Sequence, residues 1–423
     1  MKNVPVRRSW LGRLSRLAVL LIAVLAVTTG VRGQSTLPAP VAAEASPVPV
    51  AAEPGAAAPI VDPNLQQVYC PGCEGGLFGS GPHHGGPGGC ATGECGCGGQ
   101  PRCVPGRPCC GGYHDDHDAT WLYRCCSRFY QCICCPDNCY EPRWIAAADA
   151  GFFIDAARPA TQMRLRGDMN RGMDFPDRAE YFWARSDGKG KGPGLPTAGN
   201  HRIDNYEFTM YTEAAAGKAG IAFEMPYRHW EAVNGGFGSQ ALTGAAGIAD
   251  FRIYTKAMLL DCELMQMTFQ MKIFTPNGVA GRGLGTGHTS LEPSLLWSLK
   301  LARETYLQAQ LSQFIPLGGD PVYDGSIMHY HFALNHVICR LPHELQLIAT
   351  GEFNGWSFQS GSYTDVNDVP IIQPANHFTY TAAGAGLRLV MCDKIDVGFG
   401  TLVGLNTPNW FDNLYRVEFR WRF

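Results

Sequence analysis

Charged and polar side chains recur at every second position along several apolar stretches of the sequence. His329 and His331, for example, alternate with Met328, Tyr330 and Phe332. In a strand this spacing puts all the polar groups on one face. Inside a closed sheet such groups either pair with one another and fill the lumen, or line an aqueous pore and set its selectivity; the sequence leaves both open. The candidates are Arg252, Lys256, Lys272, Glu292, Lys300, His329, His331, Glu344, Glu352, Arg388, Arg416, Glu418, Arg420 and Arg422, with Glu207, Glu224, Arg228 and Asp396 in equivalent positions.

His288 and Ser290 form a second candidate. A strand would place both side chains on one face, as a serine activated by histidine requires. The pair is faintly similar to the His-x-Ser of outer-membrane phospholipase A, but no Asn-Gly follows it. Leu291 and Trp297 have the opposite parity and would face outward. We therefore expect a polar strand end at His288 and Ser290, and we predict that the protein is not an enzyme.

Cysteine and histidine clusters form a third candidate. Of the 17 cysteines, 14 lie between Cys70 and Cys139, in motifs such as CPGC and CICC, with HDDHD at 114–118 between them. No second CxxC follows at zinc-ribbon distance, and an exported chain favours disulfides over metal binding or free thiols. We predict no metal site and no cofactor. The remaining Cys262, Cys339 and Cys392 fall at short turns, where they either pair or are unrelated small residues.

Twelve alternating stretches must position the polar face. Period-two alternation is the signal of a strand, and many of these stretches run ten to fourteen residues. A tilted strand needs about 9–11 residues to cross a bilayer, whereas a globular strand is usually about 5–6 residues long. The stretches lie near 145–156, 205–214, 218–230, 247–260, 263–274, 288–301, 304–315, 326–339, 343–356, 376–392, 394–405 and 413–423.

The connections between these stretches alternate in length. Those after even-numbered stretches are tiny, such as RE and CDK, whereas those after odd-numbered stretches are longer, the first spanning 157–204. An outer-membrane barrel has short periplasmic turns, long external loops and an even strand number. We therefore predict an all-β fold, an antiparallel transmembrane β-barrel of about 12 strands. The alternative, a soluble sandwich or lipocalin-like barrel, would show the same alternation but has no reason for the turn asymmetry.

The N-terminal third has a different composition. Residues 1–33 combine a basic start, an apolar run and small residues before Gln34, which is typical of a signal peptide. Residues 34–69 form a Pro/Ala-rich linker, and 70–143 form a Cys/Gly/Pro-rich irregular segment that we place in the periplasm. The barrel then spans 144–423. A net charge of −3 gives no indication of a nucleic-acid partner.

The chain ends on the alternating stretch YRVEFRWRF. A closed barrel leaves no edge strand, so we expect this stretch to pair with the first one, near Trp144–Ala156. Tyr415, Val417, Phe419 and Trp421 would then face lipid, and Phe423 would lie at the periplasmic rim. Phe423 is similar to the C-terminal signal that the barrel-assembly machinery reads in outer-membrane proteins.

Residues 251–301 resemble the outer-membrane proteins associated with phenol meta-cleavage pathways, transporters of FadL-like character. The resemblance is carried by TPNG at 275–278 and GTGHTSLEPSLL at 285–296. The Cys-rich prefix is similar to those of planctomycete cell-surface proteins. These resemblances imply a channel or transporter for small solutes, hydrophobic ones included. The alternatives are a non-conducting structural or surface-interaction protein and, more remotely, a barrel-embedded hydrolase. The expected partners are outer-membrane lipid, the barrel-assembly machinery and an unidentified solute.

Overall fold

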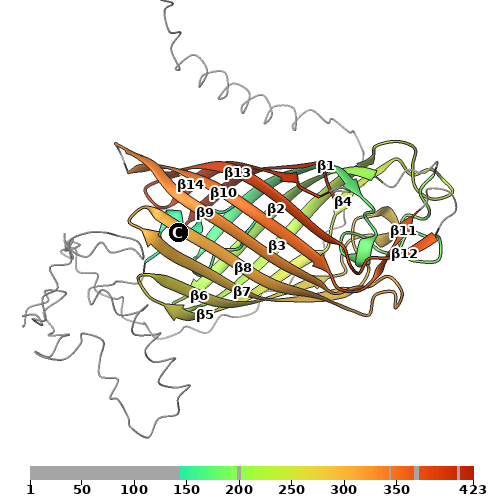
Figure 1. Ribbon diagram of the computed structural model, residues 1–423, viewed down its shortest axis with the longest axis horizontal. Helices are drawn as coiled ribbons and strands as arrows, with labels where there is room; N and C mark the ends of the chain where they lie inside the picture. Colours follow the sequence, from blue (N-terminus) through green and yellow to red (C-terminus); the bar gives the residue numbers. More distant parts are fainter. Residues whose placement is uncertain (1–142, 198–201, 343, 366–370, 407–409) are drawn as a thin grey trace, which may run out of the picture. The chain divides into compact units, whose positions relative to one another are not determined.

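The computed structural model describes residues 143–197, 202–342, 344–365, 371–406 and 410–423. Twelve antiparallel strands form one closed barrel and run obliquely to its axis (Figure 1). The predicted fold class is confirmed. The barrel strands are β1 (Gln162–Asp174), β2 (Arg202–Ala216), β3 (Ala219–Ala232), β5 (Phe251–Asp261), β6 (Met265–Thr275), β7 (Thr289–Ala302), β8 (Thr305–Leu317), β9 (Ile327–Leu341), β10 (Leu345–Phe358), β13 (Thr379–Met391), β14 (Ile395–Gly404) and β15 (Asn413–Arg422).

Closure of the barrel corrects one prediction. The last strand, β15, pairs with Gln162–Asp174, in the register Met163↔Trp421, and not with residues 145–156. Those residues contain a short 3₁₀ helix, η1 (Ala146–Asp149), and no strand. The predicted first long connection, 157–204, is therefore also wrong, because it contains β1.

The barrel is polar inside and apolar outside. On β8, for example, Gln310 is 4% exposed while its neighbour Leu311 is 40% exposed. A soluble barrel would bury its apolar face and expose its charged face. The observed arrangement suits lipid outside and a polar lumen inside. The outward face carries Phe208, Ile221, Phe332, Leu334, Leu387, Phe399, Val417 and Trp421 among others.

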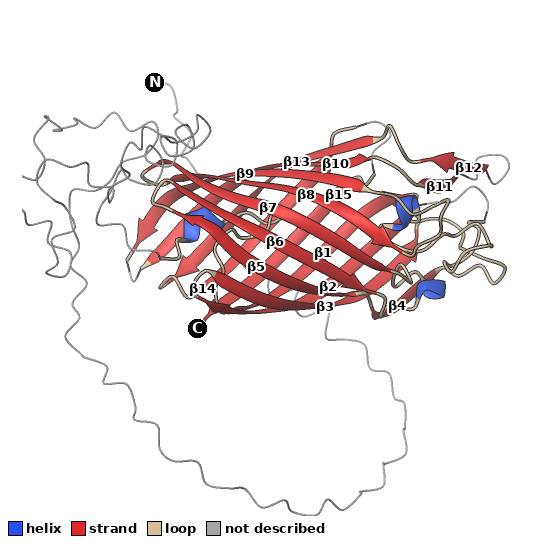
Figure 2. Ribbon diagram, turned by 90° about the horizontal axis from the view of Figure 1, so that it is seen from below, coloured by secondary structure: helices blue, strands red, loops and turns tan. Residues whose placement is uncertain are grey.

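The two ends of the barrel differ as the connection lengths predict. Turns of a few residues join β2 to β3, β5 to β6, β7 to β8, β9 to β10 and β13 to β14 at one end. Figure 2 shows the long connections at the other end, away from the carboxyl terminus. They carry η2 (Arg178–Glu180), η3 (Ala280–Arg282), β4 (Gly244–Ile248) and the hairpin β11 (Ser362–Asp365) and β12 (Ile371–Pro374). No helix among the described residues is long and apolar enough to cross a membrane.

An aromatic core packs in these long connections. Trp183 is fully buried and makes edge contacts with Trp230 and Phe237, at 4.9 and 5.2 Å between ring centroids. Arg178, also buried, lies among the rings of five aromatic residues, of which Tyr380 (4.7 Å) and Tyr363 (4.9 Å) are the nearest. We call the packed part of these connections, residues 175–197 with 231–243, 359–365 and 371–378, the cap.

Candidate functional site

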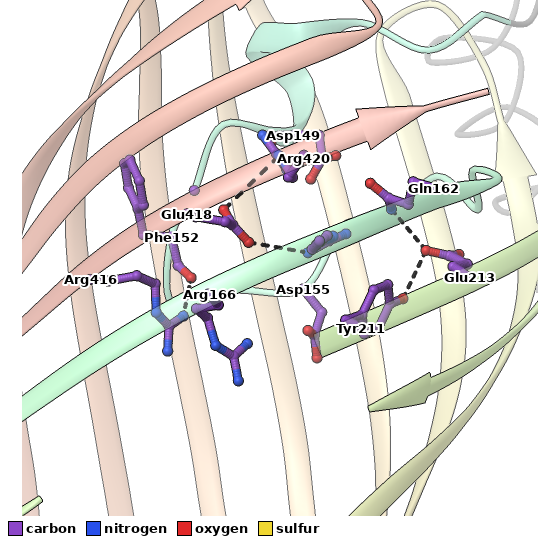
Figure 3. Close-up of polar contacts among 12 residues, drawn as sticks. Asp149, Phe152, Asp155, Gln162, Arg166, Tyr211, Glu213, Arg416, Glu418 and Arg420 are labelled. Carbon is purple, nitrogen blue, oxygen red and sulfur yellow. Dashed lines mark hydrogen bonds and ion pairs between the residues drawn. The ribbon is translucent and has the colours of Figure 1, made fainter. Parts of the chain in front are cut away.

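The lumen holds residues 144–160, which we call the plug. The plug begins at the short-turn rim, where the Arg422 guanidinium lies 3.4 Å from the Trp144 ring centroid. It reaches inward to the Phe152 carbonyl, which accepts a hydrogen bond from Arg416 (Figure 3). It returns to the same rim, where the Ala160 amide donates to Glu213 at 3.3 Å. The segment predicted as the first strand is therefore a re-entrant element inside the barrel.

Polar side chains of the wall satisfy the plug backbone. The Gly151 amide donates to Gln308 at 2.8 Å, the Asp155 amide to Gln310 at 2.9 Å, and the Phe153 amide to Glu352 at 3.1 Å. A chain without regular structure needs such partners, because an unpaired buried backbone group is costly. The wall residues at these positions therefore replace the hydrogen bonds that a strand would have made.

A cluster of buried arginines ties the plug to the last strands. Arg388 donates to Asp396 at 2.5 Å, to Glu418 at 2.6 Å and to the Ala150 carbonyl at 3.2 Å. Arg420 donates to Asp396 at 2.8 Å and to the Asp149 carbonyl at 2.7 Å. Buried charges are tolerated only when paired and hydrogen-bonded. Because plug carbonyls supply part of that pairing, the cluster depends on the plug being in place.

The ring of Phe152 lies in a recess made by missing side chains. A Cβ added at Gly386, Gly398 or Gly400, on β13 and β14, would come within 2.3 to 2.8 Å of this ring. Atoms do not approach that closely, so only glycine fits at these wall positions while Phe152 is seated. The Arg388 guanidinium covers the ring at 4.4 Å from its centroid. The wall is therefore shaped to receive this one aromatic side chain.

A cavity of about 230 Å³ lies between the plug and the cap. One wall is charged, and its cations are all paired. Arg228 donates to Glu207 at 3.0 Å, and Arg416 donates to Asp168 at 2.6 Å. The remaining lining is largely aromatic, from β6, β8, β10 and the long connections. These aromatic residues are Tyr181, Phe182, Phe274, Phe314, Trp356, Trp410 and Phe411.

The cap above the cavity contains acidic side chains without a full set of counter-charges. Asp177 is buried and accepts hydrogen bonds from Thr364 (2.6 Å) and from the Ser186 amide (3.4 Å). Burial raises the pKa of the Asp177 carboxyl from 3.8 to about 6. Burial also raises the pKa of Glu180, whose carboxylate lies 3.5 Å from His288 Nδ1. Asp320 lies next to the cap. Its desolvation would raise the pKa of the carboxyl, but hydrogen bonds from backbone amides and Arg185 outweigh that effect and lower the pKa.

The structure distributes thirteen of the fourteen residues predicted to line the lumen over three levels. The first group contacts the plug or the arginine cluster and consists of Glu352, Arg388, Arg416, Glu418, Arg420 and Arg422. The second group lines the cavity and consists of Arg252, Lys272 and again Arg416. Glu292 and His329 pair at 3.3 Å beside the cavity, and the His331 ring lies near them. Lys256 pairs with Glu213 at 3.3 Å, and Lys300 with Glu263 at 2.9 Å, nearer the short turns.

One of these predictions is wrong in position. Glu344 is exposed in the turn between β9 and β10, with φ at 55°, and does not face the lumen. The alternation that predicted an inward-facing side chain for Glu344 does not continue into the turn. Sequence reasoning also missed Arg166 and Asp168, because β1 was not recognised. Its sequence, QMRLRGDMNRGMD, alternates clearly enough to have been found.

His288 and Ser290 do not form a catalytic pair. His288 faces Glu180 in the cap, and the Ser290 hydroxyl has no hydrogen-bond partner among the described residues. Cys339 and Cys392 are free thiols near the short turns, whereas Cys262 is disulfide-bonded. The signal peptide and the Cys-rich segment, with the disulfides predicted within it, lie outside the described residues.

No family model matches the chain, and no curated protein matches it. Among solved structures, it is similar to the NanC porin (11% identity, TM-score 0.36, 62% of this chain and 100% of that one). It is also similar to an outer membrane channel from Pseudomonas putida F1 (10%, 0.40, 63% and 96%) and to the Ralstonia pickettii toluene transporter TbuX (9%, 0.31, 63% and 90%). At these identities the likeness concerns the barrel fold alone. The resemblance to phenol meta-pathway proteins and to planctomycete prefixes stays a prediction.

Proposed function

We propose that this chain is an outer-membrane transport protein for a small solute, held by its plug in a closed state. The observation that supports this is the cavity of about 230 Å³ inside a polar lumen, with the plug on one side and the cap on the other. A barrel that served only as an anchor would have no need for a solute-sized space lined by converging polar and aromatic groups.

The barrel itself is of the outer-membrane type. Its strands run from 10 to 15 residues, long enough to cross a bilayer when tilted. Its outward face is apolar, and its short turns lie at one end. We infer that the short-turn end is periplasmic. Since the plug starts there at Trp144, the preceding Cys-rich segment would also lie in the periplasm.

The plug is the element that we assign as the gate. It lies on the periplasmic side of the cavity, and a solute that crosses the lumen must pass it. Its bonds to the wall are hydrogen bonds and ion pairs, which can exchange with water as the plug moves. The same bonds are numerous enough to favour a second candidate function, a non-conducting barrel that anchors the N-terminal segment to the membrane.

Conductance in planar bilayers distinguishes the two functions. We expect the full-length protein to be mostly closed, with brief openings, and Phe152→Ala to open much more often because the ring no longer holds the plug tip. The control is Phe353→Ala on the lipid-facing side of β10, where Phe353 is 38% exposed. If neither the wild type nor Phe152→Ala conducts, although both shift on gels after boiling as folded barrels do, the anchor function stands and transport is rejected.

Phe423 supports an assembly role. It is 69% exposed at the rim, its ring lies 4.6 Å from that of Trp421, and its amide donates to the Thr161 carbonyl at 3.2 Å. The backbone is thus fixed by the closing strand pair while the ring stays accessible. We propose that the barrel-assembly machinery reads this residue.

A further inference from the structure

Four uncharged buried polar atoms of residues that line the cavity have no partner. They are Asn170 Oδ1, Asn205 Oδ1, Ser290 Oγ and Trp410 Nε1, and none has a hydrogen bond within the described part of the chain. Arg166 Nε also lacks a hydrogen bond there, but it lies 3.2 Å from a carboxylate oxygen of Asp168. All four side chains are more than nine-tenths buried. Asn170 and Asn205 are cross-strand neighbours on β1 and β2, while Ser290 comes from β7 and Trp410 from the connection before β15, so three places in the chain contribute to this space. Buried polar groups are normally paired, and four that line one space indicate an occupant that pairs with them.

The charges around the cavity exclude an anionic occupant. Arg166 pairs with Glu224 at 3.0 Å and Arg252 with Glu207 at 3.1 Å, while Lys272 lies 3.4 Å from Asp155. Arg228 and Arg416 are paired as described above. The carboxylate of Asp250 accepts the amides of Gly278 and Thr286, each at 2.8 Å. Because each described cation that lines the cavity already has a carboxylate partner, none of these guanidinium and ammonium groups is left to hold a carboxylate or phosphate of a ligand.

The four unpartnered atoms also indicate which class of uncharged ligand fits the cavity. The two asparagine oxygens accept, the Trp410 indole donates, and Ser290 does either. A hydroxyl group can satisfy any of them, because it donates and accepts. A hydrocarbon would leave all four unpaired, and a protonated amine could not accept from Trp410. Trp356, Phe274 and Phe314 line the same cavity, and the negative quadrupole of an aromatic face attracts the polarised C–H bonds of a saturated ring.

We propose that the cavity binds an uncharged, polyhydroxylated solute of one ring, such as a monosaccharide or a cyclitol. A cavity of 150 Å³ in another protein holds benzene, so about 230 Å³ suits one ring with its hydroxyl groups. The inference rests on the proposed transport function for its biological meaning. The binding site itself needs no movement of the plug.

Equilibrium binding to the folded full-length protein in detergent tests the proposal. The probes are glucose and myo-inositol, with gluconate as the anion, glucosamine as the cation and toluene as the ring without hydroxyls. Trp356 and Trp410 line the cavity, so tryptophan fluorescence reports occupancy alongside calorimetry. We expect saturable binding of glucose or myo-inositol, and weaker or no binding of the other three.

Variants link that binding to the four atoms. Trp410→Phe removes the indole donor together with one ring of the indole, and Ser290→Ala removes only the hydroxyl; each should weaken binding about tenfold. The matched control is Thr209→Val, which deletes a fully buried wall hydroxyl that does not line the cavity and should leave affinity unchanged. Mobility before and after boiling checks that each variant is folded.

Three results would overturn the proposal. These are no saturable binding of either uncharged polyol, tighter binding of gluconate or toluene, or equal affinity in wild type, Trp410→Phe and Ser290→Ala. In the first case the four atoms are satisfied by water alone. Conductance tests transport separately. Binding without conductance would reject the transport function and keep the binding site. Conductance without binding would reject the binding site and keep the transport function.

Discussion

Replacing Phe152 with alanine should release the tip of the plug. The side chain is 3% exposed, and a buried phenylalanine replaced by alanine typically costs about 3–5 kcal/mol. The glycine recess cannot collapse to fill the space, because it is backbone of two paired strands. The contact with Arg388 adds about 1 kcal/mol. Taking the lower end, about 3 kcal/mol, the released tip becomes roughly 100-fold more populated.

Hydrogen exchange at the plug measures this population directly. The amides of Gly151, Phe153 and Asp155 are bonded to wall side chains, so they exchange only when the tip is released. We expect their protection to fall about 100-fold in Phe152→Ala, while strand amides of the barrel keep theirs. Unchanged protection in a folded variant would refute the assignment of Phe152 as the anchor of the plug.

A double-mutant cycle separates the anchor from general packing. Gly398→Ala brings a methyl group within 2.6 Å of the Phe152 ring and should release the tip in the wild type. In the Phe152→Ala background the clash is gone, so the two effects should be strongly non-additive. Gly351→Ala is the control, since a Cβ there meets nothing within 4 Å. Additive effects would show that Gly398 and Phe152 act independently.

Three further predictions concern the cap, the arginine cluster and the carboxyl terminus. The pKa of Asp177 is about 6 in the folded cap and 3.8 when the cap is unfolded, so the folded cap binds a proton more tightly. The cap should therefore be up to about 3 kcal/mol more stable below pH 4 than above pH 6. Exchange of amides 177–186 across this range should show the loss as pH rises, and Asp177→Asn should abolish it. Asp396→Asn leaves buried guanidinium groups short of a counter-charge and should lower the free energy of unfolding in liposomes by about 3 kcal/mol, whereas Asp393→Asn in the neighbouring turn should change it little. Deleting Phe423 should reduce the amount of heat-modifiable barrel in the outer membrane without changing conductance per inserted barrel; normal insertion of the deletion variant contradicts the signal assignment.

The strands were predictable because period-two alternation records which side of the sheet each residue faces. It identified β7 from Leu291 and Trp297 against Glu292, and it gave the correct strand number. That number was reached with one wrong strand, since 145–156 was counted and 162–174 was not. The plug resembles a strand in composition because it too is buried, but its neighbours are lumen side chains and not lipid. The alternation of 162–174 and the pairing of β1 with β15 distinguish the strand from the plug.

The plug contacts limit how the barrel can open. Twelve hydrogen bonds join the plug backbone to wall side chains among the described residues. If each contributes about 1 kcal/mol, complete expulsion of the plug costs roughly 10 kcal/mol or more. At that cost the expelled state would be too rare to carry solute. Release of the tip alone, from Gly151 to Asp155, breaks a few of these bonds and leaves Asp149 on Arg420. Opening should therefore be a local displacement next to the cavity, with η1 staying in place, which is why Phe152 and its glycine recess are the decisive positions to test.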